Sequence, residues 1–481
     1  MALEPLGAIT FLVGFACLLL GQQVSIFALL IASLLGASAA AFITAMNNAN
    51  IQPAHFLLAF LALELFFRGS LLRAGLESLA VSRAGFWLLV TVLYSVVTAV
   101  LMPRLFAGAT YVFNIAQQGS GGAGIVLVPL APVSANVTQT IYFAGDFICF
   151  VIFYAYASTR EGLETVGRAM VVCAFVNLAF ATLDLATYFT GTSELLSFYR
   201  NTSYRMLDDV ELAGFKRIVG SFTEASAFAY ATLGLFAFTF TLWLRRAFSP
   251  FSGIAAALSL AAIIFATSTA GYFGLVLFVV WRYSHAVLQV AMGRATRNAL
   301  IFVVCAPVIA SIVVMAIWMH PETRHTAQQI IDVTIFSKLD SESGIERASW
   351  NSQALNVFRD TMGLGAGVGS VRASSWLIAV PASLGILGTI TYGMFIICIF
   401  VTGRRGDQEP KAEAIQAAAR ASCVALIMAS SVAGSFIDLG LPFFALAATA
   451  CARPRRRPAV EALQGYIPVR LHSAPAFNTN V

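Results

Sequence analysis

Charged side chains are scarce in this chain: they make up 11% of its 481 residues, whereas hydrophobic side chains make up 59%. The mean hydropathy of +0.82 lies far above that of soluble domains and excludes a soluble globular protein. Lysine is nearly missing, since Lys216, Lys338 and Lys411 are the only ones, and the formal net charge of +6 comes from arginine. In a polytopic membrane protein such a charge reports on topology, so we expect no nucleic-acid partner.

Cysteine and histidine provide no metal or disulfide framework. The seven cysteines lie irregularly within or beside apolar runs, which indicates neither disulfides nor a metal centre. His320 and His325 have no cysteine or carboxylate pattern around them, so they make a weak metal pair. We therefore expect no metal site and no cofactor. Glu4, with no basic segment before the first apolar run, favours a membrane anchor over a cleaved signal peptide.

Long apolar runs predict an all-α, polytopic membrane helix bundle. Two runs are interrupted, 254–281 by STAG and 421–451 by GSFIDLGLP, and we expect two helices in each. This gives about 12 to 13 spans in a single transmembrane domain over 1–452. No internal repeat is visible, which disfavours a secondary transporter built from repeated halves. The remaining predicted spans are 6–21, 24–45, 53–67, 86–106, 140–158, 167–190, 226–244, 298–319 and 376–401.

The placement of arginine predicts which connections face the cytoplasm. Arginine-bearing connections alternate with others along the chain, and the positive-inside rule assigns them to the cytoplasm. The uncharged connection 107–139 and the N-terminus then lie outside. The basic tail 453–481 is rich in proline and small residues, and we expect it to be disordered cytoplasm. The connections assigned to the cytoplasm are 68–83, 160–168, 245–246, 282–297 and 404–405.

Two predicted outer loops, 191–225 and 320–375, carry positive charge against this rule. Long loops can escape the rule, and both loops are long, so that explanation stays open. The alternative is that both loops bind an anion at the outer surface. Their basic residues are Arg200, Arg205, Lys216 and Arg217 in the first loop, and Arg324, Lys338, Arg347, Arg359 and Arg372 in the second.

The second loop also carries a helical pattern followed by a glycine ladder. Apolar residues at helical spacing predict a surface helix over Arg347–Met362, lying over the membrane. Glycines at alternate positions then permit an irregular turn with positive φ values, and its backbone N–H groups could face an anion. The apolar side of the helix is Ala348, Ala354, Leu355 and Phe358, and the ladder is Gly363, Gly365, Gly367 and Gly369.

The string RIVGSFTEASAF begins with Arg217 at the outer mouth of a predicted span. Arginine presents a fixed fork that matches phosphate oxygens and keeps its proton. Two interpretations of Glu224 stay open. It could complete a capping box with Ser221 before the apolar run, or it could act as a base or partner for an acceptor hydroxyl.

Three carboxylates lie inside apolar spans, where such groups are functional suspects. Glu64 precedes Arg68 by four residues and could simply pair with it. Asp146 and Asp184 are expected nearer the outer side, where they could line a polar cavity. The STAG sequence, by contrast, is best explained as a small-residue turn that lets two helices pack closely.

Three strings, RIVGSFTEASAF, STAG and GLGAGVGSVRASSWLIAVPASLGILG, occur in this order around one long outer loop. In this the chain resembles the bacterial O-antigen polymerase and ligase superfamily (Wzy and WaaL type), over roughly Arg217 to Tyr392. The resemblance implies a helical inner-membrane protein whose active site faces the periplasm. It also implies transfer of a glycan from undecaprenyl pyrophosphate, with inversion and without a metal. The implied partners are that lipid-linked glycan, membrane lipid and a chain-length regulator protein.

The resemblance also implies site residues. Arg217 matches the arginine of the first motif and Glu224 its acidic position, while Arg347 and Arg372 fall where such loops hold arginines. We expect these four residues to be catalytic. The expected substrate-binding residues are Arg359, Gly367, Gly369, Ser374 and Ser375.

Two departures from the superfamily pattern favour a polymerase of O-antigen, capsule or exopolysaccharide repeat units. Ligases usually have a histidine shortly before the GxxG that Gly385 and Gly388 form here, where this chain has Ser374 and Ser375. Many relatives also have arginine at the position of Ala270. A ligase that transfers finished glycan to a lipid or protein is the first alternative. A transporter of lipid-linked sugars is the second, although it would need polar groups along several spans.

Overall fold

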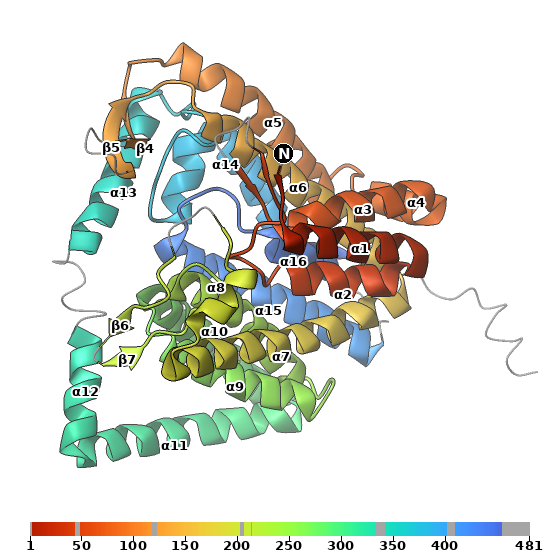
Figure 1. The fold of residues 1–481 in the computed structure, drawn as a ribbon. Helices are drawn as coiled ribbons and strands as arrows, with labels where there is room; N and C mark the ends of the chain where they lie inside the picture. Colours follow the sequence, from red (N-terminus) through yellow and green to blue (C-terminus); the bar gives the residue numbers. More distant parts are fainter. Residues whose placement is uncertain are drawn as a thin grey trace, which may run out of the picture.

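A computed structural model describes residues 2–43, 49–117, 123–202, 206–212, 214–332, 342–401 and 409–454 (Figure 1). Helices dominate it, which confirms the all-α, polytopic membrane bundle. Eight helices of the described residues are long and apolar enough to cross a membrane. They are α5 (Ala84–Leu105), α6 (Ser134–Ala157), α7 (Arg160–Thr190), α8 (Ala225–Leu244), α10 (Thr269–Ala291), α11 (Arg297–Met319), α14 (Trp376–Val401) and α15 (Pro410–Ala433).

The remaining apolar helices are shorter, and this lowers the span count below the predicted 12 to 13. A ninth span results if α3 (Pro53–Phe67) and α4 (Gly69–Glu77), bent by 104° at their junction, cross as one. The predicted breaks at STAG and GSFIDLGLP are confirmed, because each separates two helices. The four short apolar helices are α1 (Pro5–Leu20), α2 (Gln22–Ala32), α9 (Phe251–Phe265) and α16 (Leu441–Cys451).

The prediction of one span over 24–45 is wrong. Helix α2 ends at Ala32, and the chain then turns into a short strand, β2 (Ala41–Ile43). The turn is held by the loop before α8, because the backbone N–H of Ala37 donates to the Ser221 carbonyl at 2.9 Å. Gly36 faces Phe222 so closely that a Cβ would lie 2.6 Å from its ring. Packing against a distant loop therefore ends this helix.

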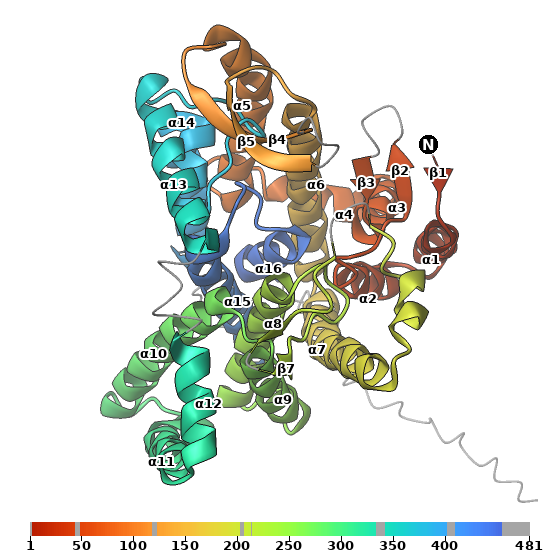
Figure 2. The same cartoon turned by 60° about the vertical axis from the view of Figure 1, so that its left-hand side comes forward.

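Short surface elements cover one end of the bundle. The helix predicted over Arg347–Met362 is confirmed as α13 (Glu342–Asp360), which packs beside β4 (Figure 2); its position over the membrane stays a prediction. Its buried side is centred on Ala354 and Val357, whereas Ala348 and Leu355, both predicted to be on the apolar side, are exposed. The other surface elements are α12 (Pro321–Ile331), the 3₁₀ helix η2 (Ser193–Phe198), strands β1 (Ala2–Leu3) and β3 (Ala49–Ile51) with β2, the hairpin β4 (Tyr111–Gln117) and β5 (Ala123–Pro129), and the hairpin β6 (Glu211–Leu212) and β7 (Phe215–Lys216).

The connections gather at two ends as the arginine pattern predicts. At one end, ion pairs join Arg160 to Glu409 at 2.6 Å and Lys411 to Glu164 at 2.7 Å. At the other, the Gln353 side chain donates to the Tyr111 carbonyl at 2.6 Å. Figure 1 shows α12, α13 and the two hairpins along the left side, and α4 at the right. We call the end that bears α12 and α13 the loop end.

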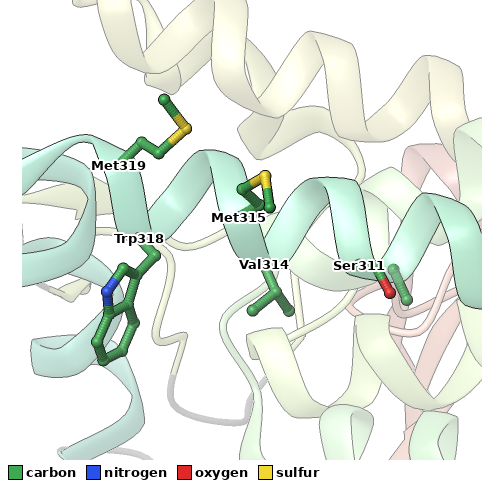
Figure 3. A pocket seen from close by; sticks show the side chains of 6 residues that line it. Ser311, Val314, Met315, Trp318 and Met319 are labelled. Atoms are coloured by element: carbon green, nitrogen blue, oxygen red, sulfur yellow. The ribbon is translucent and has the colours of Figure 1, made fainter.

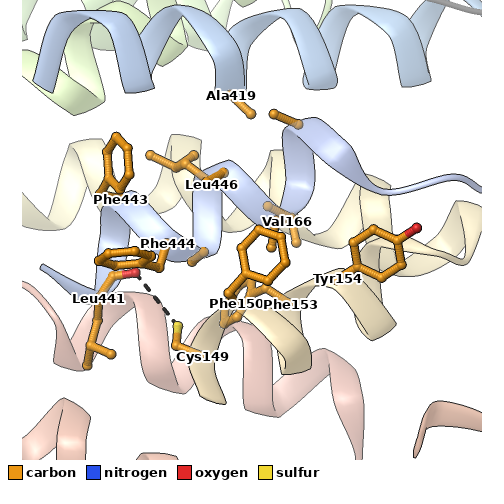
Figure 4. Packing of buried hydrophobic residues seen from close by; sticks show 14 of the residues in the cluster. Cys149, Phe150, Phe153, Tyr154, Val166, Ala419, Leu441, Phe443, Phe444 and Leu446 are labelled. Atoms are coloured by element: carbon orange, nitrogen blue, oxygen red, sulfur yellow. Dashed lines mark hydrogen bonds between the residues drawn. The ribbon is translucent and has the colours of Figure 1, made fainter. Parts of the chain in front are cut away.

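The core is centred on α6, α15 and α16. Every residue of α16 except Pro442 is buried, and its Phe444 ring meets those of Phe143 on α6 and Phe395 on α14. Figure 4 shows α16 beside α6, with the Cys149 thiol hydrogen-bonded to the Leu441 carbonyl. With 11 residues α16 is about 16 Å long, roughly half the thickness of the hydrocarbon core. The non-helical segment before it, 434–440, packs against the bundle through the buried Ile437 and Leu439, whereas Phe436 is 40% exposed. Irregular backbone in a membrane protein is tolerated where protein surrounds it.

Candidate functional site

The loop that carries Arg217 is shaped by Asp184 of α7. One carboxylate oxygen of Asp184 accepts the backbone N–H groups of Val219 at 2.8 Å and Gly220 at 3.1 Å. The other accepts from Arg200 at 2.6 Å, and Lys216 lies 3.5 Å away. The side chains of Asp184, Arg200 and Lys216 are all buried. Asp184 therefore fixes the loop's backbone, and it does not line an open cavity as expected from the sequence.

Glu224 stands at the start of α8 without capping it. It occupies the N-cap position, but its side chain makes no capping hydrogen bond. The hydroxyl of Ser221 donates to the Leu34 carbonyl at 2.7 Å, so the predicted capping box is wrong. The Glu224 carboxylate instead accepts from the Ser226 hydroxyl. The other interpretation, in which Glu224 acts as a base or as a partner for an acceptor hydroxyl, stays a prediction.

Arg217 reaches from this loop to the turn between α9 and α10. Its Nη2 donates to the Thr267 carbonyl at 3.2 Å, and its Nε is buried without a hydrogen-bond partner. Thr267 directly precedes STAG, whose Ser268 caps α10 and whose last three residues open that helix. Gly271 packs closely on Ala229, as a Cβ there would lie 2.7 Å from the Ala229 side chain. The small-residue turn predicted from the sequence is thus confirmed, and it supplies an acceptor for Arg217.

Arg372 lies on the segment just before α14 and is held by α13. Its guanidinium carbon lies 4.6 Å from the ring centroid of Trp350. Two residues on, the backbone N–H of Ser374 donates to the Asn351 side chain at 2.7 Å. The Nε of Arg372 is buried and unpartnered. Neighbouring residues of α13 therefore fix both the side chain and the backbone of this segment.

The four predicted catalytic residues converge, although they come from three separate segments. Burial lowers the pKa of the Arg217 guanidinium; the charge of Glu224 opposes this shift, and that of Arg347 adds to it. Burial also lowers the pKa of Arg372, against the charges of Glu346 and Glu224. Glu224 thus lies within electrostatic reach of two of the arginines, and Arg347 within reach of one.

This cluster, which we call the arginine cluster (Arg217, Glu224, Arg347 and Arg372), has more positive than negative charge. Within the described residues, no ion pair closer than 4.0 Å involves any of its members. Half-buried guanidinium groups with unpartnered N–H donors match an anion with several oxygen acceptors, such as a phosphate or diphosphate.

The glycine ladder packs against neighbouring helices, and this occupies one of the N–H groups that were expected to face an anion. Its positive φ values are confirmed, from 77° at Gly363 to 87° at Gly367. The N–H of Gly367, however, donates to the Ser383 carbonyl at 3.0 Å, so it is not free to face an anion. A Cβ at Gly369 would lie 2.3 Å from the Ala135 carbonyl oxygen of α6. These glycines let the loop pack against α14, α5 and α6 and so position Arg372.

The other predicted substrate-binding residues divide between scaffold and surface. Ser374 and Ser375 are buried, and the Ser375 carbonyl accepts the first helical hydrogen bonds of α14, from Ile378 and Ala379. Arg359 is exposed on the last turn of α13, about 18 Å along the helix from Arg347. It is not brought to the arginine cluster. Arg205 and Lys338 lie outside the described residues.

Sequence reasoning missed three residues around the cluster. Trp350 and Asn351 on α13 hold the Arg372 segment. Tyr272, directly after STAG on α10, lies within electrostatic reach of Arg217, and its hydroxyl donates to the Ile264 carbonyl at 2.6 Å. The sequence could have suggested Tyr272, because this residue directly follows the STAG motif. Nothing in the sequence indicated a role for Trp350 or Asn351.

A shallow apolar hollow of about 510 Å³ lies elsewhere, along α11 (Figure 3). Helix α11 packs on α10 and α8 at its edge and is buried only at Ala299. No residue of the arginine cluster lines the hollow, so the chemistry is not centred there. Among the described residues, no group of three or more His, Cys, Asp or Glu side chains could hold a metal ion. The hollow is lined by Ala310, Ser311, Val314, Met315, Trp318 and Met319.

No protein-family model matches this chain, and no curated protein sequence is significantly similar to it.

Proposed function

We propose that the protein is a membrane glycosyltransferase that polymerises lipid-linked oligosaccharide repeat units at the periplasmic face of the bacterial inner membrane. The observation that carries this proposal is the convergence of three arginines and Glu224 from separate segments at the loop end. A diphosphate is the anion that best suits such a set, because it offers several acceptors to bidentate donors. The resemblance described above adds the undecaprenyl carrier and the glycan.

The reaction needs stabilisation of the leaving diphosphate and a base for the acceptor hydroxyl. The bond between the donor sugar C1 and the diphosphate oxygen breaks, and the leaving diphosphate gains negative charge. Preorganised guanidinium groups stabilise that charge, by a few kcal/mol for each donor. The acceptor hydroxyl attacks C1 and loses its proton, for which Glu224, within electrostatic reach of two of the arginines, is the carboxylate base.

The polyprenyl chain of the donor requires a route along the membrane. Both views show α11 and α12 projecting from the bundle, with α12 at the loop end (Figures 1 and 2). The apolar hollow along α11 supports a path for an isoprenoid chain from the lipid toward the loop end. Arginines at that end would then meet the diphosphate while the chain stays in the bilayer.

The test is polymer formation by the purified protein from purified lipid-linked repeat units. We expect products of increasing length with wild-type protein, and none with Glu224→Ala. Cells that lack the protein should accumulate lipid-linked single repeat units. Accumulation of lipid-linked long chains would instead indicate a ligase, and no lipid-linked glycan at all on the periplasmic side would contradict both enzymes.

A transporter of lipid-linked sugars is the second candidate, and one observation favours it. Polar side chains lie deep in the bundle, with Asp146 on α6 fully buried and His55 on α3 close to it. Carboxylates at such depth are common in ion-coupled transporters. Reconstituted vesicles that contain lipid-linked repeat units distinguish the two, because a transporter changes the sidedness of these units and a polymerase changes their length.

A further inference from the structure

Asp146 is the buried carboxylate that the proposed reaction does not use. It is the thirteenth of the 24 residues of α6, so it lies near the middle of that helix. The residue is 0% exposed, and neither of its carboxyl oxygens has a hydrogen-bond donor. The other two intramembrane carboxylates have hydrogen-bond donors: one oxygen of Glu64 accepts from Ser25 and Tyr156, and Asp184 accepts from the loop before α8. Of these three described carboxylates, Asp146 alone is left without a donor.

A second carboxyl group, Asp438, lies beside Asp146. It is half-buried on the irregular segment 434–440, which meets α6 here, because the Cys149 thiol, one turn after Asp146, donates to the Leu441 carbonyl at 3.7 Å. The Asp438 carboxyl acts on Asp146, and one of its oxygens also accepts the Gly440 N–H at 2.5 Å. This segment is firmly held, because Trp376 and Tyr392 both donate to the Ile437 carbonyl, at 3.0 and 3.1 Å, and Tyr230 donates to the Leu439 carbonyl at 3.0 Å. These aromatic donors are directed at the backbone, so they do not neutralise the carboxyl pair.

Two ionised carboxylates offer acceptors only and repel each other. A hydrogen bond between them exists only when one of the two carries a proton. No lysine or arginine of the described residues acts on Asp146, so no basic side chain balances a double negative charge. The close approach of the two carboxyl groups therefore defines a place for one proton.

His55 links this pair to the loop end. A Cβ on Gly145, the residue that precedes Asp146, would lie 3.6 Å from the His55 ring, and the Asp438 charge acts on that ring. Both ring nitrogens are buried without a hydrogen-bond partner. The ring also packs on Tyr142, with centroids 4.7 Å apart, and the Tyr142 hydroxyl donates to the Asn50 carbonyl next to the surface loops. An imidazole can accept a proton on one nitrogen and release one from the other.

We propose that the buried Asp146 and the half-buried Asp438 bind one proton between them and exchange it with the loop end through His55. The proton passes from water to one ring nitrogen, and the other nitrogen donates to the carboxyl pair; release reverses the order. The groups that face the pair from the surrounding helices are Cys149 on α6, Tyr230 on α8, Tyr392 on α14 and His55 on α3. The site stands independently of the proposed glycan chemistry.

The test is infrared spectroscopy of the full-length protein in detergent at pH 7. We expect the C=O band of a protonated carboxylic acid in wild-type protein, shifted by transfer to D₂O. Asp146→Asn and Asp438→Asn should each remove this band. In either variant the carboxamide can donate an N–H to the remaining carboxylate, so the fold should be retained, and gel filtration checks this. Asp209→Asn, at an exposed loop position, is the matched control and should keep the band.

A second measurement isolates His55. His55→Gln should leave the amplitude of the band unchanged but slow its D₂O shift at least several-fold, because the exchange partner is lost. An unchanged exchange rate would overturn the role of His55. A wild-type band equal to that of both Asp→Asn variants would overturn the proton site. Loss of the wild-type band on adding Na⁺ at constant pH would also overturn it, in favour of a monovalent-cation site.

Discussion

The guanidinium carbon of Arg372 lies 4.6 Å from the ring centroid of Trp350, so the segment before α14 is stacked on α13. An arginine on an aromatic face keeps its N–H edge free to bind oxygen acceptors while its position is fixed. The unpartnered Nε of Arg372 fits this arrangement. The surface helix thus acts as a support that aims one arginine of the arginine cluster.

Removing that support should weaken the site. Trp350→Ala is expected to cost about 1 to 2 kcal/mol of transition-state stabilisation, or roughly a 5- to 30-fold drop in polymerisation rate. Trp350→Phe should retain part of the rate, because an aromatic face remains. Rates are measured with purified lipid-linked repeat units at matched protein levels. Equal rates for wild type and Trp350→Ala would show that the stacking is incidental.

The shape of the arginines should matter as well as their charge. Arg217→Ala is expected to lower the rate by roughly a hundredfold or more, since a few kcal/mol of charge stabilisation is lost. Arg217→Lys keeps the charge without the fork and should still be impaired. Arg359→Ala is the control, because Arg359 is exposed and apart from the cluster. Normal polymer from Arg217, Arg347 and Arg372 alanine variants would refute the anion-binding mechanism.

Replacing Asp184 should lower the stability of the fold. The side chain of its partner Arg200 is 5% exposed and that of Asp184 itself 2%, so Asp184→Asn leaves buried positive charge with less compensation. We expect a loss of about 3 to 5 kcal/mol, seen as a lower midpoint of thermal unfolding in detergent. The exposed variant Asp209→Asn should unfold like wild type. An unchanged midpoint for Asp184→Asn would contradict the role assigned to its contacts.

The loop end should face the periplasm. A cysteine at Ser197 on η2 is expected to react with an impermeant thiol reagent in whole cells, and one at Ala295 to be protected. The exposed native Cys305 is first replaced by serine. The opposite labelling pattern would invert the topology and separate the arginines from any periplasmic substrate. Ser341, a natural second position in the loop, lies outside the described residues.

The local pattern of the sequence was sufficient for most helices and for the positions of the loops. Apolar runs predict where helices lie, and the charge of the two outer loops predicts that arginines meet there. It could not predict features that depend on distant partners. The end of α2 is set by the loop around Ser221 and Phe222, and the N–H of Gly367 is taken by α14. Neither partner is visible in local periodicity.

The same limit applies to Asp438. In the sequence Asp438 is one polar residue within a helix break. Nothing nearby indicates that a buried carboxylate lies opposite it. Asp146 lies almost three hundred residues earlier on another helix. Only the folded bundle places the two together. The predicted tail from 455 onward, by contrast, lies outside the described residues.

The dimensions of α16 impose an order on biogenesis. An 11-residue segment of about 16 Å cannot stably occupy a lipid bilayer by itself, and its neighbours cover almost every one of its faces. We therefore expect α16 to settle last of the three, after α6 and α15 have formed the surfaces that it packs against. A chain that ends before Leu441 should leave those apolar surfaces uncovered.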